Sequence, residues 1–307
     1  MDSFLYDVVM PIKKEDLYLV KKNCKYIFEF LPVKRIIIIT NTYDLNESFE
    51  DDRIEIIDEN NLYLGLTFDK VKELERSNKY LKKKLTGYYY QQFLKLAYAY
   101  VTDDAGYLVW DADTIPIKKI EVKDMDGKPY FYMKSEYRKE YFDTMEKVLG
   151  VNKQLEKSFI VEHMYFEKDL VKEMLEVIQD NRNIEGNTWW EKIILAMEAD
   201  NAFSEFETYG NYVYAHHRDS YVLRDACSLR YGKMLVGKNP TDPQLKWLSK
   251  QYESISIEHW DRETIFSYVS HIGLVRKAVK PSTYYKLSYG IEKRIDKLKQ
   301  RIFFLRS

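Results

Sequence analysis

The hydrophobic pattern of the first part of the chain predicts a strand, a helix and two further strands. Three apolar runs have the length of buried strands and cover residues 5–12, 33–41 and 54–58. Between the first two runs, apolar residues recur at spacings of three or four and predict a helix from about Lys14 to Phe30: Leu17, Val20, Cys24, Ile27 and Leu31. The pattern therefore predicts an α/β fold, Rossmann-like, with a mostly parallel central sheet flanked by helices.

Further elements follow along the chain. The pattern predicts helices over residues 68–84, from Gly87 onward and over 137–149, and strands over 129–133 and 158–166. Thr188 and Glu191 have the spacing of a capping box that opens another helix. Residues 203–212 are predicted to form a short helical turn that Gly210 ends as a C-cap, and a strand carrying His216 and His217 is expected after it.

Two carboxylates follow the apolar run that ends at Trp110. Successive side chains of a strand point to opposite faces, so Asp111 and Asp113 are expected to share a face while Ala112 points away. Mg²⁺ or Mn²⁺ commonly takes one or two protein carboxylates and completes its shell with phosphate oxygens and water. The pair is therefore a candidate cation site that would hold a diphosphate, and two solvated aspartates in a turn are the alternative.

Composition and charge narrow the function class. The chain has 307 residues, 45% of them hydrophobic and 32% charged, and its net charge of −1 argues against a dedicated nucleic-acid-binding protein. Its two cysteines, Cys24 and Cys227, lack metal-ligand spacing and are expected to be free thiols of a reducing compartment. No apolar run reaches the roughly 20 residues needed to span a bilayer, and the N-terminus lacks a secretion signal, so a cytoplasmic protein is expected.

Two stretches resemble a known family. The segment from Tyr107 to Pro116 is similar to the D-x-D segment of GT-A-fold nucleotide-sugar glycosyltransferases, and residues 87–96 (GYYYQQFLKL) resemble a segment of bacterial members that serve capsule or other surface-polysaccharide assembly. The resemblance covers roughly residues 5 to 220. It implies a catalytic GT-A domain over 1–225, a UDP-sugar or another nucleotide diphosphate-sugar as donor, a growing glycan or lipid-linked glycan as acceptor, and Mn²⁺ or Mg²⁺ held by Asp111 and Asp113.

The donor side of the expected site comes from two segments. Gln91 and Lys95 are four residues apart and share a face of the predicted helix, with Gln92 beside them. The resemblance implies that these three side chains point into the donor site, whereas the pattern alone is also typical of a solvated polar face. Lys13 follows the first strand and is a candidate to neutralise phosphate, the alternative being a solvated lysine at a helix start.

The acceptor side and the catalytic base are implied by the resemblance. Glu162 and His163 lie where related enzymes flank the acceptor, and residues 204–210 (SEFETYG) resemble the region that carries the base of inverting enzymes. Glu205 is the first candidate for the base and Glu207 the second, with stabilisation of a helix start as the alternative for both. A late histidine is a common third metal ligand in such enzymes, and His216 is preferred over His217.

The C-terminal part has a different character. After a turn-rich segment at 239–243, helical patterns dominate residues 226–307, and residues 274–307 contain ten Lys or Arg against two Asp or Glu. Leu287, Ile291, Ile295, Leu298, Ile302 and Phe303 are interleaved with these cations. Such a basic amphipathic end could lie on the inner face of the cell membrane, or could pack on the protein with its cations in water.

Two other functions share part of this pattern. A sugar nucleotidyltransferase also needs acidic metal ligands, but neither G-x-x-x-x-G-K-[ST] nor G-x-G-x-x-G occurs in the chain. A non-catalytic carbohydrate-binding or assembly protein could keep the same fold without turnover. A glycosyltransferase is the function that the sequence favours.

Overall fold

The computed structural model describes residues 5–43, 45 and 48–304, and the side chains of these residues up to Gln300. The chain divides into two compact units, each of which is discontinuous in sequence. The first consists of Met1–Ala112 and Glu121–Ala226, and the second of Asp113–Ile120 and Cys227–Ser307. The resemblance implied one catalytic domain over 1–225, which includes residues 113–120. In the structure these eight residues group with Cys227–Ser307.

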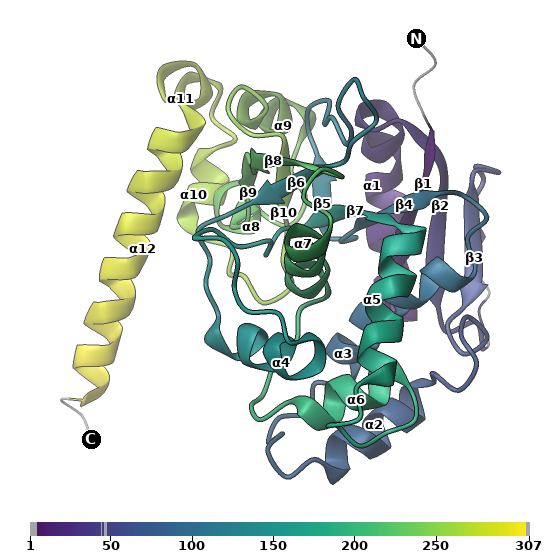
Figure 1. Cartoon of the computed structure of the whole chain (residues 1–307). Helices are drawn as coiled ribbons and strands as arrows, with labels where there is room; N and C mark the ends of the chain where they lie inside the picture. Colours follow the sequence, from purple (N-terminus) through teal and green to yellow (C-terminus); the bar gives the residue numbers. More distant parts are fainter. Residues whose placement is uncertain (1–4, 44, 46–47, 305–307) are drawn as a thin grey trace. The chain divides into compact units, whose positions relative to one another are not determined.

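The first unit is built on a five-stranded sheet (Figure 1). Its strands in spatial order are β3 (Ile54–Asp58), β2 (Val33–Thr40), β1 (Tyr6–Pro11), β4 (Gly106–Trp110) and β7 (His163–Glu167). All neighbours are parallel except β7, which runs antiparallel to β4. The predicted mostly parallel sheet is confirmed, and the buried isoleucines of β2 explain its inner position.

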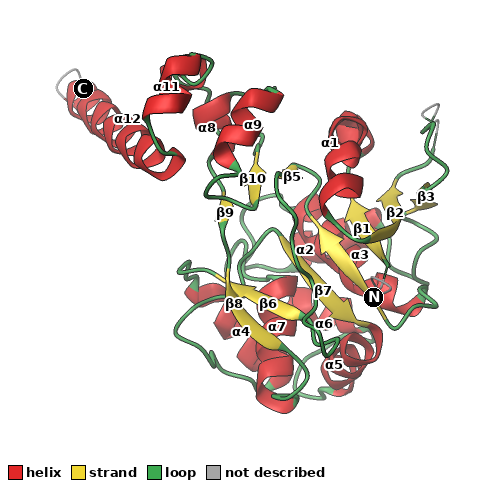
Figure 2. Ribbon diagram, turned by 90° about the horizontal axis from the view of Figure 1, so that it is seen from above, coloured by secondary structure: helices red, strands yellow, loops and turns green. Residues whose placement is uncertain are grey.

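Helices cover both faces of this sheet. A 3₁₀ turn (Lys14–Asp16) leads into α1 (Leu17–Phe30), which connects β1 to β2. From β3 the chain returns past β1 to β4 through α2 (Phe68–Ser77), α3 (Thr86–Ala97) and a second 3₁₀ turn (Tyr98–Tyr100). The two connections run in opposite directions along the sheet, and right-handed crossovers of this kind place α1 and α3 on opposite faces, as Figure 2 shows.

The rest of the first unit packs against the β7 side. Helices α4 (Lys139–Leu149), α5 (Lys168–Asp180), α6 (Trp189–Ala196) and α7 (Glu205–His216) lie here, and β6 (Tyr130–Met133) pairs in parallel with β8 (Val222–Asp225). The predicted capping box at the start of α6 is present, because Thr188 accepts from the Glu191 backbone and the Glu191 carboxylate accepts from the Thr188 backbone.

The second unit contains a small sheet and five helices within the described residues. β10 (Ser254–Ser256) lies between β5 (Thr114–Pro116), which is antiparallel to it, and β9 (Ser228–Leu229), which is parallel. The helices are α8 (Gly232–Val236), α9 (Asp242–Leu248), α10 (Ile265–Val269), α11 (Gly273–Ala278) and α12 (Pro281–Phe304). The predicted helical C-terminal extension is confirmed. Among the described residues, none of the helices combines the length and apolarity that crossing a bilayer requires.

Four local predictions are wrong. The helix predicted over 68–84 ends at Ser77, because the Asn78 side chain bonds the carbonyls of Ile194 and Met197 and draws the chain away. The strand predicted over 158–166 begins only at His163. Helix α7 runs without a break from Glu205 through Gly210 to His216, so neither the C-cap at Gly210 nor the strand at His216 is present.

Candidate active site

The candidate site lies at the carboxyl ends of β1 and β4, two adjacent parallel strands. From β1 the chain continues to β2 and β3 on one side, whereas β4 lies on the other side. In an open α/β sheet, ligands bind beyond the carboxyl ends of the strands where the strand order reverses in this way. Asp111 directly follows β4, and Lys13 follows β1 by two residues.

Helix α3 presents two polar side chains to these strand ends. The Gln91 amide donates to the Pro11 carbonyl at the end of β1, at 2.8 Å. One turn later, the Lys95 ammonium contacts Asp111 Oδ1 at 2.7 Å and Glu205 Oε1 at 2.6 Å. The spacing of four residues, which puts both side chains on one face of the helix, thus brings Gln91 to one strand end and Lys95 to the other.

Lys95 is a buried cation between two carboxylates. Burial alone would lower the pKa of its ammonium, but the charges of Asp111 and Glu205 outweigh burial and raise that pKa. The ammonium also lies 4.6 Å from the centre of the Phe206 ring. Lys95 is therefore charged at neutral pH and links the acidic residue after β4 to the first residue of α7.

Glu205 is held by the start of α7. Ser204 caps this helix through its hydroxyl, and the side-chain oxygen Oε1 of Gln92 accepts from the Glu205 backbone N–H at 3.0 Å. Burial raises the pKa of the Glu205 carboxyl, while the Lys95 charge opposes that rise. The net effect is a carboxylate with a stronger affinity for a proton than an exposed glutamate. Gln92 therefore positions Glu205 by binding the Glu205 backbone.

Glu207 has a different environment. Its carboxylate accepts from the Ser158 hydroxyl at 2.7 Å, from the Phe159 backbone at 2.8 Å and from the Asn211 amide at 2.9 Å. These contacts fasten the loop before β7 to α7. Three donors on one buried carboxylate account for Glu207 structurally, and Glu207 shares no contact with Lys95 or Asp111 among the hydrogen bonds described here.

The turn after β4 is anchored from two sides. The Asp111 backbone donates to the Glu162 carbonyl at 3.0 Å, and the Asn23 amide donates to the Ala112 carbonyl at 3.0 Å. β4 ends at Trp110 and residues 112–113 form a turn, so the strand alternation expected for Asp111 and Asp113 does not apply.

Asn23 was not identified from the sequence as a residue that supports this turn. Asn23 lies three residues after Val20 and four before Ile27, and this spacing puts its amide on the buried face of α1 in place of Cys24.

The donor set at this turn fits a hard divalent cation. Asp111 is 30% exposed and uses Oδ1 for Lys95. Asp113 follows in the second unit, where its carbonyl accepts from the Ile257 backbone at 2.9 Å. Within the described residues, no three His, Cys, Asp or Glu side chains group as a metal site. Mg²⁺ and Mn²⁺ need only one or two carboxylates when phosphate oxygens complete the shell, so the partly exposed Asp111 carboxylate at the end of β4 is compatible with such an ion.

His216 lies far from Glu205 and therefore from the Lys95 contact at the end of β4. It ends α7, whereas Glu205 begins it, and eleven residues at 1.5 Å each separate the two by about 16 Å. His216 is exposed and packs against Tyr212, with ring centres 4.8 Å apart. His217 accepts or donates at Glu173, 2.8 Å away. The structure therefore does not bring either histidine to Asp111.

The expected acceptor residues are both buried. Glu162 forms an ion pair with Lys134. His163 stacks on Trp110 with ring centres 4.7 Å apart and contacts Tyr132 at 5.0 Å. Both ring nitrogens of His163 are buried without a hydrogen-bond partner, and burial lowers its pKa to about 4. His163 is thus a neutral core residue next to the site.

Lys13 lies beside the first turn of α3. A Cβ added to Gly87 would lie 3.4 Å from the Lys13 side chain, so the lysine stem passes over this glycine. Lys13 is exposed, and its ammonium is at the same edge of the sheet as Gln91 and Lys95. The structure therefore groups Lys13, Gln91, Lys95 and Asp111 around the ends of β1 and β4.

Comparison with known proteins gives one family. A protein-family profile described as a family of unknown function (DUF6492) matches residues 28–273. Among proteins with curated descriptions, no sequence matches this chain.

Several solved structures are similar at low identity. Mouse xyloside xylosyltransferase 1 in its apo form is 9% identical with a TM-score of 0.41, covering 74% of this chain and 87% of that chain. The bifunctional glycosyltransferase WbbM in its apo form is 12% identical with a TM-score of 0.46, covering 93% of this chain and 52% of that chain. The galactosyltransferase LgtC, in complex with donor and acceptor sugar analogues, is 10% identical with a TM-score of 0.39, covering 89% and 100%.

Proposed function

Because the chain belongs to a family of unknown function (DUF6492), its activity has to be inferred from its own site, and we propose that it is a metal-dependent GT-A glycosyltransferase. The donor is a nucleotide diphosphate-sugar, with a UDP-sugar preferred. The observation that carries this proposal is the contact of Lys95 with Asp111 and Glu205 at the carboxyl ends of β1 and β4. It joins a candidate metal ligand and a candidate base in one buried group.

Different residues would bind different parts of the donor. Asp111 and Asp113 would hold Mn²⁺ or Mg²⁺, whose charge stabilises the leaving diphosphate. Lys13 is exposed at the same edge and adds positive charge for phosphate. Gln91 is fixed by the Pro11 carbonyl, which orients its remaining amide oxygen for a donor hydroxyl or base.

The proposed transfer is a single displacement with inversion. The hydroxyl oxygen of the acceptor attacks the anomeric carbon, and the bond from that carbon to the diphosphate oxygen breaks with its electron pair leaving on the diphosphate. Glu205 takes the hydroxyl proton. Burial raises the pKa of Glu205, which makes it a better base than an exposed glutamate, and the Lys95 charge opposes part of that rise.

We also propose that the acceptor is a growing bacterial surface glycan, free or lipid-linked. This rests on the resemblance of residues 87–96 to enzymes of capsule and surface-polysaccharide assembly. The enzyme would then work in the cytoplasm, at the inner face of the cell membrane.

Nucleotide-sugar turnover tests the proposal. Purified protein with Mn²⁺ should hydrolyse or transfer at least one sugar from a panel of UDP-, GDP- and CDP-sugars. Asp111→Asn should lower kcat by about a hundredfold or more, because the leaving diphosphate loses its counter-charge. Glu205→Gln should lower kcat of transfer by about 10²–10⁴, because it removes the base while the glutamine oxygen can still accept from Lys95.

The matched control is Asp126→Asn, which changes an exposed carboxylate in the turn before β6 and should leave turnover unchanged. Failure of every nucleotide-sugar to bind in calorimetry, with and without Mn²⁺, would contradict the proposal. Turnover that survives both Asp111→Asn and Glu205→Gln would place the active site elsewhere.

A further inference from the structure

Helix α12 carries an exposed apolar stripe. Leu287, Ile291, Ile295 and Leu298 are 58%, 43%, 36% and 56% exposed. Their spacings of four, four and three place them on one face of the helix. Ile302 continues the sequence pattern, but its side chain lies outside the described residues. Four large aliphatic side chains in line on one helix form a surface that a protein in water does not normally leave uncovered.

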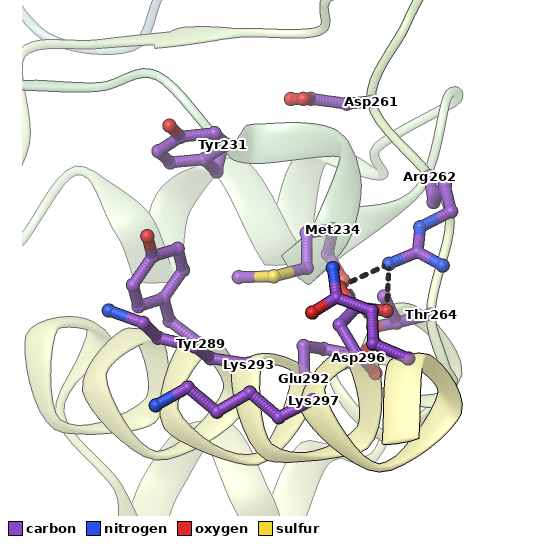
Figure 3. A pocket seen from close by; sticks show the side chains of 11 residues that line it. Tyr231, Met234, Asp261, Arg262, Thr264, Tyr289, Glu292, Lys293, Asp296 and Lys297 are labelled. Atoms are coloured by element: carbon purple, nitrogen blue, oxygen red, sulfur yellow. Dashed lines mark hydrogen bonds and ion pairs between the residues drawn. The ribbon is translucent and has the colours of Figure 1, made fainter. Parts of the chain in front are cut away.

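Helix α12 packs on its own unit at two places. Near its start, Tyr284 is buried against Trp247 and Phe266, and it lies three residues before Leu287, on the side of the helix where the stripe begins. Further along, Tyr289, Lys293 and Asp296 line a cavity of about 390 Å³, as Figure 3 shows. Asp296 is fixed there by Arg262 at 2.7 Å. At 3.6 residues per turn, the cavity-lining residues and the apolar stripe lie on roughly opposite sides of the helix. The stripe therefore faces away from the cavity.

The charges around the stripe are mainly positive. Arg294 lies one turn from Ile291 and from Leu298, and Lys299 lies one turn from Ile295 on the other edge. Both cations are exposed. Of the acidic residues in the described part of α12, Asp296 lies on the far side and pairs with Arg262, whereas Glu292 lines the cavity and also lies one turn from Ile295, on the same edge as Lys299. The edge with Arg294 is thus cationic, and the edge with Lys299 carries one cation and one carboxylate.

We infer that α12 binds the surface of an anionic lipid bilayer, with the stripe among the acyl chains and Arg294 and Lys299 at the headgroups. An apolar face flanked by cations is the pattern of helices that lie in the membrane interface. The described part from Pro281 to Gln300 is about 30 Å long, which gives room for several headgroup contacts. A second copy of the chain fits less well, because pairing two stripes would bring like charges of both helices together.

This inference does not depend on sugar transfer, and flotation with lipid vesicles tests it directly. The full chain should bind vesicles of phosphatidylcholine with about one phosphatidylglycerol in three, and bind pure phosphatidylcholine vesicles more weakly. The double variant Ile291→Gln/Leu298→Gln should lower partitioning roughly tenfold or more, because two buried aliphatic side chains are lost. The double variant Arg294→Gln/Lys299→Gln should lose most of the preference for anionic vesicles.

The matched control is Leu64→Gln/Met125→Gln, which changes two equally bulky side chains of the first unit that are each 96% exposed. It should bind vesicles as the wild type does. Nucleotide-sugar hydrolysis without lipid should be the same in Ile291→Gln/Leu298→Gln and wild type, so a loss of lipid binding is separable from a loss of activity. The inference is overturned if the wild type does not float with anionic vesicles or if the stripe variant floats equally well. A concentration-dependent dimer that the stripe variant abolishes, with no vesicle binding, would assign the surface to a second copy.

Discussion

His163 shows how a single side chain can be close to a site without being available to a ligand. Its ring stacks on Trp110, the last residue of β4, and neither nitrogen has a hydrogen-bond partner. Burial lowers its pKa to about 4 from an ordinary value of 6.5. The unfolded chain therefore binds a proton at His163 between these two values while the folded chain does not, and stability falls as the pH drops through that range.

We predict that His163→Phe removes much of this acid sensitivity. The pKa difference corresponds to about 3 kcal/mol of unfolding free energy between pH 6.5 and pH 4. Phenylalanine keeps the stacking on Trp110 and removes two unsatisfied nitrogens, so at pH 7 the variant should be as stable as the wild type or more stable by about 1 kcal/mol. Urea unfolding at several pH values measures both effects.

The control for this measurement is His271→Gln, which changes an exposed histidine of the second unit. Its stability should follow the wild-type pH dependence. Equal slopes of stability against pH for wild type and His163→Phe would show that His163 is not the group responsible.

At the same scale, helical spacing could predict which side chains share a face, but it could not predict their contacts with distant parts of the chain. Gln91 and Lys95 could be assigned to one helix face from their spacing, and this is observed. The contact of Lys95 with Glu205 could not be foreseen, because 110 residues separate them and periodicity describes only local neighbours. Asn23 was missed because Cys24, the apolar neighbour, was assigned to the buried face of α1, although Asn23 has the spacing from Val20 and Ile27 that this face requires.

Gly210 is an example at the scale of an element. A glycine near the end of a predicted helical turn is typical of a C-cap, but here it lies in the middle of α7. A Cβ at this position would lie 2.5 Å from the Phe159 ring. Glycine is therefore needed for the close approach of the loop before β7, a contact that no local pattern encodes. The strands β1, β2 and β3 could be predicted because each is a short segment dominated by aliphatic residues.

We predict that Gly210→Ala destabilises the protein although alanine is the better helix former. The helix propensity gain is about 1 kcal/mol, but the clash with Phe159 costs more, and the net loss should be about 1–3 kcal/mol. Gly290→Ala in α12 is the matched control, because nothing lies within 4 Å of the added Cβ. It should be neutral or stabilise by about 0.5–1 kcal/mol. Urea unfolding compares the two, and a stabilising Gly210→Ala would contradict the packing argument.

On the scale of the whole molecule, the main departure from the sequence pattern is that both units are discontinuous. Residues 113–120 follow the candidate site directly, yet β5 pairs with β10, Ile115 opposite Ile255. A short strand whose partner is far along the chain cannot be assigned from sequence. The boundary between the units falls within the D-x-D segment, because Asp111 belongs to the first unit and Asp113 to the second.

Hydrogen–deuterium exchange with UDP and Mn²⁺ tests the site proposed at the ends of β1 and β4. Binding there should slow exchange at the end of β4, in α3 and at the start of α7. At ligand concentrations about a hundredfold above Kd, binding adds about 2.7 kcal/mol, which is up to about a hundredfold slower exchange for amides that open with the site. With Asp111→Asn, this protection should be lost or much weaker at the same ligand concentration. Protection of the wild type only outside β4, α3 and α7 would refute the site at the ends of β1 and β4.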